Sequence, residues 1–247
     1  MLKKLIYYMM TLIEHGLEKK IINVLEKEKK LTVFDVGCYK GVFTEKIQEL
    51  IGKKKIKFYL FDVNKNVKKY IINLLKFKNI YYNEIALHNK NGKAAYHFNG
   101  SFECSGSSLS TMIKDDAYWV LSRKIILKML FLSTEDFTKY TVPTITLDSF
   151  VKKNKIESID LLKVDIEGSE HLMLQGAKKT LKKNKIKSIL IEIADKKNTY
   201  KKKERKVLNL LRKNNFTLLK KNIYFSPSLF SNHMAGDYQL INNKFTS

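Results

Sequence analysis

The sequence predicts an α/β protein in which helices cover both faces of a mostly parallel sheet. Two observations support this prediction. Apolar runs rich in β-branched and aromatic residues end in an acid, as in Leu31–Asp35 and Ile56–Asp62, and each run is followed by apolar residues at helical spacing. Strands of a parallel sheet are buried on both faces, and ligands bind beyond their carboxyl ends. We therefore expect the two acids at the ligand-binding edge of one sheet.

Length and composition fit a single globular domain. The chain has 247 residues, of which 44% are hydrophobic and 11% aromatic, so a disordered chain is excluded. Its two cysteines, Cys38 and Cys104, form no C-x-x-C pair and suit a reducing compartment. We expect a cytoplasmic protein, with the inner face of the membrane as an alternative location.

Residues 1–30 are predicted to form a separate N-terminal amphipathic helix. Apolar residues recur at spacings of three and four from Leu2 to Leu25, with lysines and glutamates between them. A secretory signal is the alternative, because Lys3 and Lys4 precede an apolar run, but no small-residue cleavage site follows it. No stretch reaches the length of consecutive apolar residues that a membrane-spanning helix requires.

The formal net charge of +23 raises the question of a nucleic-acid or anionic-membrane partner. Only three of the 47 basic residues are arginines, at positions 123, 205 and 212, and the lysines are spread along the whole chain. Arginine reads bases and phosphates in a bidentate manner, so its scarcity speaks against a dedicated nucleic-acid surface. We interpret the charge as a solvated basic surface that attracts anionic substrates.

A loop with two glycines follows the first predicted strand. Gly37 and Gly41 let the backbone turn tightly and approach a ligand closely, and residues 42–51 continue at helical spacing. The pattern Asp35-x-Gly37-x-x-x-Gly41 differs from the G-x-G-x-x-G of dinucleotide-binding folds. It predicts a cofactor-binding loop, and an ordinary strand-to-helix turn is the alternative.

Asp62 ends the second predicted strand. It lies about 20 residues beyond Gly41, where doubly wound folds place the carboxylate that accepts hydrogen bonds from ribose hydroxyls. The alternative is a helix N-cap, because Asn64–Leu75 is predicted to be helical. Because Asp35 and Asp62 occupy equivalent strand ends, we favour the ribose-binding role.

A third strand is expected over Ile80–Leu87. The turn Asn89–Gly92 then leads into Lys93–Phe98, which we expect to form a hairpin on the sheet. The adenine ring of a cofactor would lie near the end of the third strand, and ordinary strand packing is the alternative for the residues there. The candidates for the adenine slot are Glu84, Ile85 and Ala86.

Residues 110–140 are predicted to be an insertion that forms a lid or part of the substrate site. Within it, Ala117–Leu132 is apolar on nearly all sides and carries Arg123, Lys124 and Lys128. A helix of this kind is either packed inside or placed on an apolar surface. We expect a lid over the substrate site, with a membrane-surface contact or an oligomer contact as alternatives.

The carboxyl half holds three acids at one predicted helix start. Leu161–Val164 reads as a buried strand, Asp165 follows at its carboxyl end, and Glu167 and Glu170 bracket the start of the next helix. The helix dipole stabilises acids near an N-terminus, which is a sufficient reason for the two glutamates. Asp165 needs another reason, because its strand end is expected to face the same crevice as the acids of the first two strands.

The remaining elements complete the sheet. A fifth strand is expected over Ile186–Ile193, followed by a basic helix over Tyr200–Asn214. Phe216–Lys220 and Tyr238–Ile241 are expected to form a terminal antiparallel pair. This order agrees with the α/β fold class.

With these elements placed, the chain resembles a known family, the FkbM-type methyltransferases. In the carboxyl half the resemblance rests on VPTITLDSF, KVDIEGSEHLMLQGAKKTL and IKSILIEI, and in the amino half on DVGCYKG, FDVN, NEIAL with NGKAA, and GSSL. These motifs cover residues 31–193, and the strand GDYQLIN extends the match to residue 242. FDVN stands where the family pattern has a Glu-Pro pair, but Asp62 keeps the carboxylate. Ala117–Leu132 is not part of the pattern.

The resemblance implies a methyltransferase domain over residues 31–247. Its fold would be a Rossmann-like seven-stranded methyltransferase sheet, mostly parallel with a terminal antiparallel strand, with helices on both faces. The resemblance also implies S-adenosylmethionine as the cofactor and methyl transfer to a hydroxyl of a sugar or natural product. The residues expected to bind the cofactor are Asp35, Gly37, Gly41, Asp62, Glu84, Ala86 and Ser107.

Transfer to a hydroxyl requires the acceptor oxygen, the methyl carbon and the sulfur to be held in line, and it benefits from a base that takes the hydroxyl proton. The candidates for this base are Asp165, Glu192 and His171. Asp165 and Glu192 are also candidates to hold a divalent metal jointly, although two carboxylates alone are weak support for a metal site.

We therefore expect an O-methyltransferase that acts on a small-molecule or glycan acceptor, such as a surface polysaccharide or its lipid-linked precursor. A nucleic-acid methyltransferase is the competing hypothesis. The Asn/Asp-Pro-Pro-aromatic motif that generally accompanies methylation of base amines is absent, because the two prolines are Pro143 and Pro227. Methylation of RNA ribose stays open, as does a cofactor-binding membrane-surface protein without turnover. The sequence does not predict an oligomeric state.

Overall fold

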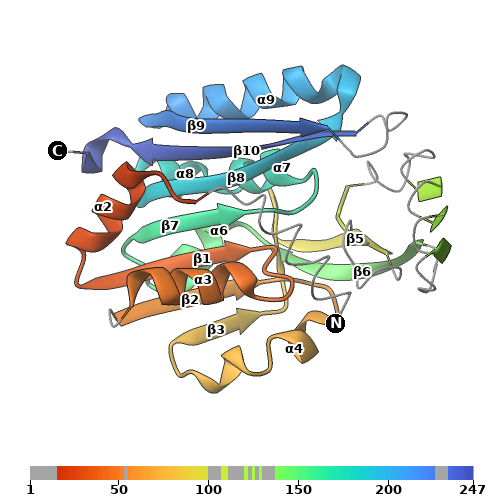
Figure 1. Cartoon of the computed structure of the whole chain (residues 1–247), viewed down its shortest axis with the longest axis horizontal. Helices are drawn as coiled ribbons and strands as arrows, with labels where there is room; N and C mark the ends of the chain where they lie inside the picture. Colours follow the sequence, from red (N-terminus) through yellow and green to blue (C-terminus); the bar gives the residue numbers. More distant parts are fainter. Residues whose placement is uncertain are drawn as a thin grey trace.

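The computed structural model describes residues 16–52, 55–99, 107–110, 137–225 and 233–246, together with six residues between positions 120 and 129. Its centre is a seven-stranded sheet (Figure 1). In spatial order the strands are β3 (Ile80–Asn83), β2 (Lys55–Phe61), β1 (Lys30–Val36), β7 (Ile159–Val164), β8 (Ile186–Lys196), β10 (His233–Asn242) and β9 (Phe216–Phe225). The first five run parallel, whereas β10 is antiparallel to both β8 and β9. The predicted Rossmann-like sheet is confirmed.

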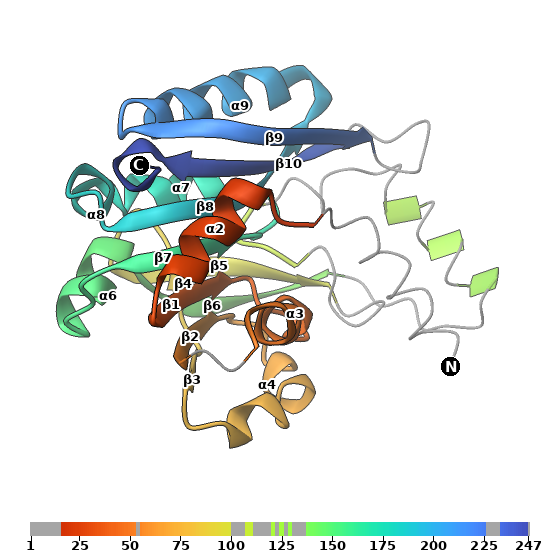
Figure 2. The ribbon, with the colours of Figure 1, turned by 60° about the vertical axis from the view of Figure 1, so that its left-hand side comes forward.

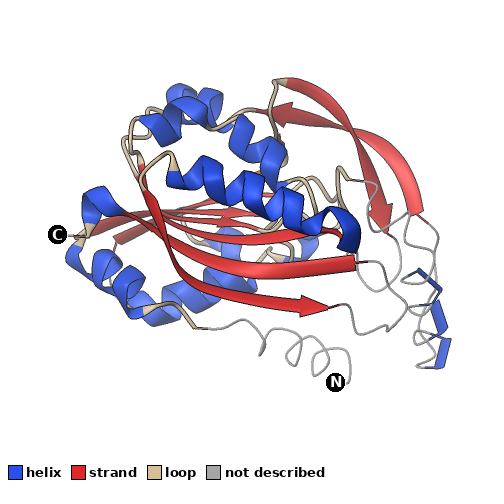
Figure 3. Ribbon diagram, turned by 90° about the horizontal axis from the view of Figure 1, so that it is seen from above, coloured by secondary structure: helices blue, strands red, loops and turns tan. Residues whose placement is uncertain are grey.

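Helices cover both faces of this sheet (Figure 3). One face packs against α2 (Lys19–Lys27), α3 (Val42–Ile51) and α4 (Val67–Tyr70), and the other against α6 (Leu147–Lys153), α7 (Glu170–Gln175), α8 (Lys178–Lys182) and α9 (Lys197–Arg212). Figure 2 shows α2 and α3 on the same side of the strands.

Successive residues of the central strands point to opposite faces of the sheet. Val33 and Leu161 belong to the apolar core beneath α2, α3 and α4, whereas Phe34 and Leu162 belong to the core beneath α6 to α9. All four side chains are fully buried. The continuous apolar runs of the sequence therefore reflect strands that are covered on both sides.

A smaller sheet adjoins the main one. Its order is β4 (Ala86–Leu87), β6 (Phe137–Ile145) and β5 (Gly92–Asn99), so that β6 lies in the middle. β6 pairs in parallel with β4 and antiparallel with β5. The chain thus leaves the main sheet after β3 and contributes the next three strands to this second sheet.

The hairpin predicted over Lys93–Phe98 is wrong, because in the described residues β5 pairs with β6 and neither with β4 nor with the main sheet. The turn before β5 bonds to the β6–α6 junction instead. The Thr146 N–H donates to Asn91 Oδ1 at 2.8 Å, and the Thr144 hydroxyl donates to the Lys90 carbonyl at 3.0 Å. A turn signal that looked local therefore serves a strand that comes much later in the sequence.

Two further boundaries differ from the prediction. The strand expected over Ile80–Leu87 is divided into β3 and β4. The helix expected over Asn64–Leu75 is reduced to α4 and a 3₁₀ turn at Leu74–Lys76. It starts later than expected because Asp and Asn side chains accept hydrogen bonds from the backbone N–H groups that precede α4. Asp62 accepts from the Asn64 N–H and Asn64 accepts from the Asn66 N–H, both at 2.9 Å.

Two other predictions lie largely outside the described residues. Residues 1–15 of the predicted N-terminal helix are outside them, and α2 accounts for its second half, with Ile21 and Leu25 buried. Most of the predicted lid, Ala117–Leu132, is also outside them, so the lid and the domain boundaries stay predictions. In the part of the chain that is described, no helix is long and apolar enough to cross a membrane.

Gly37 is predicted to tolerate no side chain, because a Cβ there would lie 1.8 Å from the Asp165 carbonyl oxygen. Gly52 is a matched control: it also has a positive φ, but no atom of the described residues beyond its chain neighbours lies within 4 Å of the place a Cβ would take. We expect Gly52→Ala to add backbone strain alone, about 1–3 kcal/mol, and Gly37→Ala to destabilise the protein further because two backbone segments must separate. Urea unfolding measures both losses, and equal losses would contradict this close packing.

Candidate active site

The carboxyl ends of β1, β2 and β7 meet at the loop of residues 37–41, which we call the glycine loop. The N–H groups of Gly37 and Cys38 both donate to the Phe61 carbonyl, at 2.9 and 3.2 Å, so the loop is fastened to the end of β2. On the other side the Asp165 N–H donates to the Val36 carbonyl at 2.9 Å. The loop is thus held between two neighbouring strands.

Asp35 lies beneath the glycine loop and is 0% exposed. The Thr44 hydroxyl of α3 donates to its Oδ2 at 2.9 Å, and Lys163 Nζ lies 3.4 Å from its Oδ1. Burial raises the pKa of this carboxyl, while Lys163 and Thr44 act to lower it. Asp35 therefore ties α3 and β7 together, and its predicted contact with the cofactor stays a prediction.

Lys163 is a site residue that sequence reasoning missed. Its Nζ donates to the Gly37 carbonyl at 2.8 Å and lies 3.4 Å from Asp35 and 3.3 Å from Asp165 Oδ2. Its side chain is only 13% exposed. The sequence signal that could have identified it is a lysine inside the apolar run DLLKVD. The structure explains this lysine: in the pairing of β1 with β7, Asp35 lies opposite Lys163, so the buried acid has a largely buried cation beside it.

Asp62 binds the glycine loop from the end of β2. Its Oδ2 accepts the Tyr39 N–H at 3.0 Å and its Oδ1 accepts the Asn64 N–H at 2.9 Å. Desolvation raises the pKa of the Asp62 carboxyl to about 6, against the lowering effect of these two bonds. The helix N-cap alternative is wrong, because α4 begins after Asn66. Asp62 is partly exposed, so a ligand can reach it, and its predicted contact with a ribose stays a prediction.

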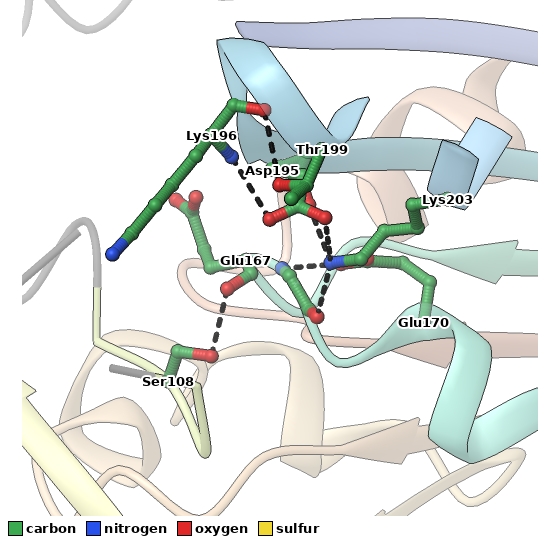
Figure 4. Close-up of polar contacts among 9 residues, drawn as sticks. Ser108, Glu167, Glu170, Asp195, Lys196, Thr199 and Lys203 are labelled. Atoms are coloured by element: carbon green, nitrogen blue, oxygen red, sulfur yellow. Dashed lines mark hydrogen bonds and ion pairs between the residues drawn. The ribbon is translucent and has the colours of Figure 1, made fainter. Parts of the chain in front are cut away.

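Asp165 begins the turn that joins β7 to α7, residues 165–168, which we call the β7–α7 turn. Its side chain is 36% exposed and faces Lys163. Two successive residues of the turn have positive φ angles, Glu167 at 52° and Gly168 at 101°. The Ser108 hydroxyl lies 3.0 Å from the Ile166 carbonyl and 2.8 Å from the Glu167 carbonyl, so its single hydrogen is shared between these two acceptors. Figure 4 shows its contact with Glu167.

Glu170 and Lys203 hold the same turn from the side opposite Ser108 (Figure 4). The Gly168 N–H donates to Glu170 Oε1 at 2.7 Å, and Lys203 Nζ donates to the Gly168 carbonyl at 2.8 Å. Glu170 is fully buried, and this desolvation raises the pKa of its carboxyl to about 7, although Lys203 acts to lower it.

The other predicted residues lie farther from the glycine loop. His171 is half-buried on α7, where desolvation and then the charges of Lys203 and Lys206 lower its pKa to about 4. Glu192 is half-buried on β8, opposite Asp237 of β10. The candidates for the adenine slot differ in their surroundings. Glu84 is exposed, Ile85 packs against the main core, and Ala86 packs beside Val63. Ser107 directly precedes the buried Ser108.

The structure thus brings five predicted residues to one edge of the sheet, namely Asp35, Gly37, Gly41, Asp62 and Asp165. The neighbouring Ser108, which the sequence did not single out, contacts the β7–α7 turn, and the predicted cofactor contact of Ser107 stays a prediction. Among the residues that the structure describes, no three His, Cys, Asp or Glu side chains are grouped to hold a metal ion.

A strand-end acid, a glycine loop and a partly exposed acid on the neighbouring strand are the arrangement expected of a methyltransferase domain. The family model described as the methyltransferase FkbM domain matches residues 35–218. The chain belongs to this family. As the FkbM family implies, the domain is an S-adenosylmethionine-dependent methyltransferase domain.

Two relatives place this FkbM chain among known proteins. The 2-O-methyltransferase NoeI of Sinorhizobium fredii is 25% identical over 172 residues, which are 68% of this chain and 65% of that protein. The crystal structure of methyltransferase FkbM from Methylobacillus flagellatus KT has the same fold, with a TM-score of 0.50 and 11% identity, over 85% of this chain and 44% of that chain. This chain therefore spans less than two thirds of the length of either relative.

The raised pKa of Glu170 predicts a specific dependence of stability on pH. Between its ordinary pKa of 4.5 and about 7, the folded state binds the proton more tightly than the unfolded chain, so stability falls as pH rises through this range. Glu170→Gln removes this dependence and keeps an oxygen for the Gly168 N–H. We expect the unfolding free energy of the variant, relative to the wild type, to increase by on the order of 1–3 kcal/mol from pH 5 to pH 8.

Urea unfolding at the two pH values measures this difference. Glu45→Gln is the matched control, because Glu45 is exposed on α3 and its replacement is expected to leave the pH dependence unchanged. A constant difference between Glu170→Gln and the wild type at both pH values would show that Glu170 is charged in the folded protein throughout.

Proposed function

We propose that this FkbM-family chain transfers the methyl group of S-adenosylmethionine to a hydroxyl of a sugar or glycan. The observation that carries the proposal is that two acids lie at one edge of the sheet. Asp62 accepts a hydrogen bond from the glycine loop, and the partly exposed Asp165 is linked to the same loop by Lys163. The likeness to a protein named a 2-O-methyltransferase supports oxygen as the acceptor atom.

The residues at the ends of β1 and β2 fit the donor. Each Asp62 oxygen accepts one backbone N–H, and a carboxylate oxygen has capacity for a further hydrogen bond. Two neighbouring ribose hydroxyls are donors that match this remaining capacity. The glycine loop would hold the rest of the donor, since it lies directly beside Asp62, to which the Tyr39 N–H donates. When bound, the donor supplies an electrophilic methyl carbon on a sulfonium.

The protein would contribute alignment and proton transfer. Asp62 and the glycine loop would hold the donor so that its methyl carbon lies in line with the acceptor oxygen, and the donor would leave as the neutral thioether once the methyl group is transferred. The hydroxyl proton passes to a carboxylate oxygen of Asp165 and from there to water. Lys163, 3.3 Å from Asp165 Oδ2, orients this carboxylate and links its position to the glycine loop.

Asp165 is a better base than the other two candidates. His171 lies on α7, beyond the β7–α7 turn, and not at a strand end. Glu192 lies within β8 and faces a second acid, Asp237, across the pair of strands. Asp165 combines a strand end, partial exposure and contact with the residues that hold the glycine loop.

We further propose a surface polysaccharide or its lipid-linked precursor as the acceptor. The net charge of +23 favours association with anionic acceptors by attracting them over distances longer than a direct contact. A cytoplasmic enzyme that works at the inner face of the membrane suits such a substrate. Comparing the methylation of surface glycans by mass spectrometry in cells with and without this protein tests the assignment.

Asp62→Ala is expected to weaken binding of S-adenosylmethionine at least tenfold, about 1.4 kcal/mol, because the ribose hydroxyls lose their acceptor. Isothermal titration calorimetry measures the dissociation constant. Glu49→Ala, which removes an exposed acid on α3, is the control and is expected to bind like the wild type. If the wild type does not bind the donor, or if Asp62→Ala binds it equally well, the cofactor site is wrongly placed.

Asp165→Asn is expected to lower turnover about a hundredfold or more while donor binding changes little, because general base assistance is worth ~10²–10⁴. Transfer of labelled methyl groups to a panel of glycans measures turnover. His171→Gln serves as the comparison and is expected to retain most of the activity. Full activity of Asp165→Asn would remove this residue from the mechanism.

A further inference from the structure

The β7–α7 turn has a backbone conformation that its own sequence does not favour. Glu167 has a φ of 52°, although it carries a Cβ, and Gly168 follows with a φ of 101°. A non-glycine residue in a sparsely populated region costs on the order of 1–3 kcal/mol and persists only where its surroundings hold it. Contacts from outside the turn must therefore maintain this conformation.

Three side chains from three different parts of the chain supply these contacts (Figure 4). The Ser108 hydroxyl donates to the Glu167 carbonyl, with the Ile166 carbonyl also within reach, Glu170 accepts the Gly168 N–H, and Lys203 donates to the Gly168 carbonyl. Both polar groups of Gly168 are thus bound by side chains from outside the turn, Glu170 of α7 and Lys203 of α9. The hydrogen bond from the Lys203 ammonium is charge-assisted, and such bonds are roughly twice as strong as neutral ones.

Lys203 has the widest reach of the three. Besides the Gly168 carbonyl, its Nζ donates to the Ala194 carbonyl at 2.8 Å and lies 3.6 Å from Asp195 Oδ2. Two of its three N–H groups thus donate to backbone carbonyl oxygens, and the Asp195 carboxylate adds an ion pair. Lys203 therefore connects the end of β8 with the turn that follows β7.

The burial of Lys203 separates it from the other lysines of α9. Its side chain is 11% exposed, whereas that of Lys201 is 63% exposed and Lys202 is also exposed. Ordering a lysine side chain and removing it from water both oppose folding. A lysine held inside the protein in this way, two residues from a lysine that is exposed to solvent, has a task other than solubility.

We propose that Lys203 is a positioning residue for methyl transfer: it fixes the β7–α7 turn against the end of β8 and thereby sets the position of the Asp165 carboxylate. The inference rests on the proposed function, in which Asp165 takes the proton of the acceptor. Lys203 touches neither donor nor acceptor. Its effect reaches the reaction through the backbone of residues 165–168, to which it is bonded at Gly168.

The test compares Lys203→Met with Lys201→Met. Methionine keeps much of the length of the side chain and removes its N–H donors, and Lys201→Met removes the same charge from an exposed position on the same helix. We expect Lys203→Met to lower kcat, counted per donor-binding site, at least tenfold. The dissociation constant of S-adenosylmethionine should change less than twofold. Lys201→Met is expected to match the wild type in both.

Rescue by a conservative variant distinguishes positioning from bulk stability. Lys203→Arg keeps a cation with several N–H donors and is expected to recover kcat at least partly. Counting turnover per donor-binding site excludes unfolded protein from the comparison. If Lys203→Met has the wild-type kcat per site, the inference is overturned while the proposed function stands. If Lys203→Met does not fold, Lys203→Gln takes its place under the same criteria.

A second measurement needs no acceptor and therefore remains decisive if the proposed function fails. Hydrogen–deuterium exchange of the peptide that covers residues 165–170 should become at least tenfold faster in Lys203→Met and unchanged in Lys201→Met, because the Gly168 carbonyl has lost its partner. Unchanged exchange in Lys203→Met would show that Lys203 does not hold the turn. Absence of methyl transfer by the wild type to every hydroxylated acceptor would refute the proposed function alone.

Discussion

The ammonium of Lys163 is the contact on which the arrangement of this site depends. It lies between two carboxylates, those of Asp35 and Asp165, and donates to the backbone of the glycine loop at Gly37. Each carboxylate belongs to a different strand end, so one cation sets the spacing of β1, β7 and the loop. A buried charge that loses its partner is strongly destabilising, which makes the three groups depend on one another.

The backbone is as important as the charges at this edge. Gly37 lies so close to the Asp165 carbonyl that no side chain fits between them, and the β7–α7 turn keeps two residues at positive φ. Strain of this kind is tolerated because the two apolar cores hold the strands on both faces. The consequence is that Asp35, Gly37 and Asp165 are held in fixed positions relative to one another by the protein's own contacts.

The sequence was informative wherever the signal is local. Apolar runs ending in Asp35, Asp62 and Asp165 predicted three strand ends correctly, because burial on both faces leaves a pattern within each strand. Contacts between distant segments left no such pattern. The pairing of β6 between β4 and β5 depends on residues far apart in the chain, and so do the bonds of Ser108 and Lys203 to the β7–α7 turn. A lysine in a basic helix looks the same in the sequence whether it is solvated or buried.

The placement of β6 beside β5 bears on how this protein can diversify. Asn99 and Phe137 are cross-strand neighbours, so residues 100–136 leave and re-enter the fold at one point, and residues 107–110 touch the β7–α7 turn on the way. Closing a longer loop between fixed ends costs only about 0.6 kcal/mol for each doubling of its length. The described strands therefore fix where this stretch begins and ends, while the cost of closure places only a weak limit on its length.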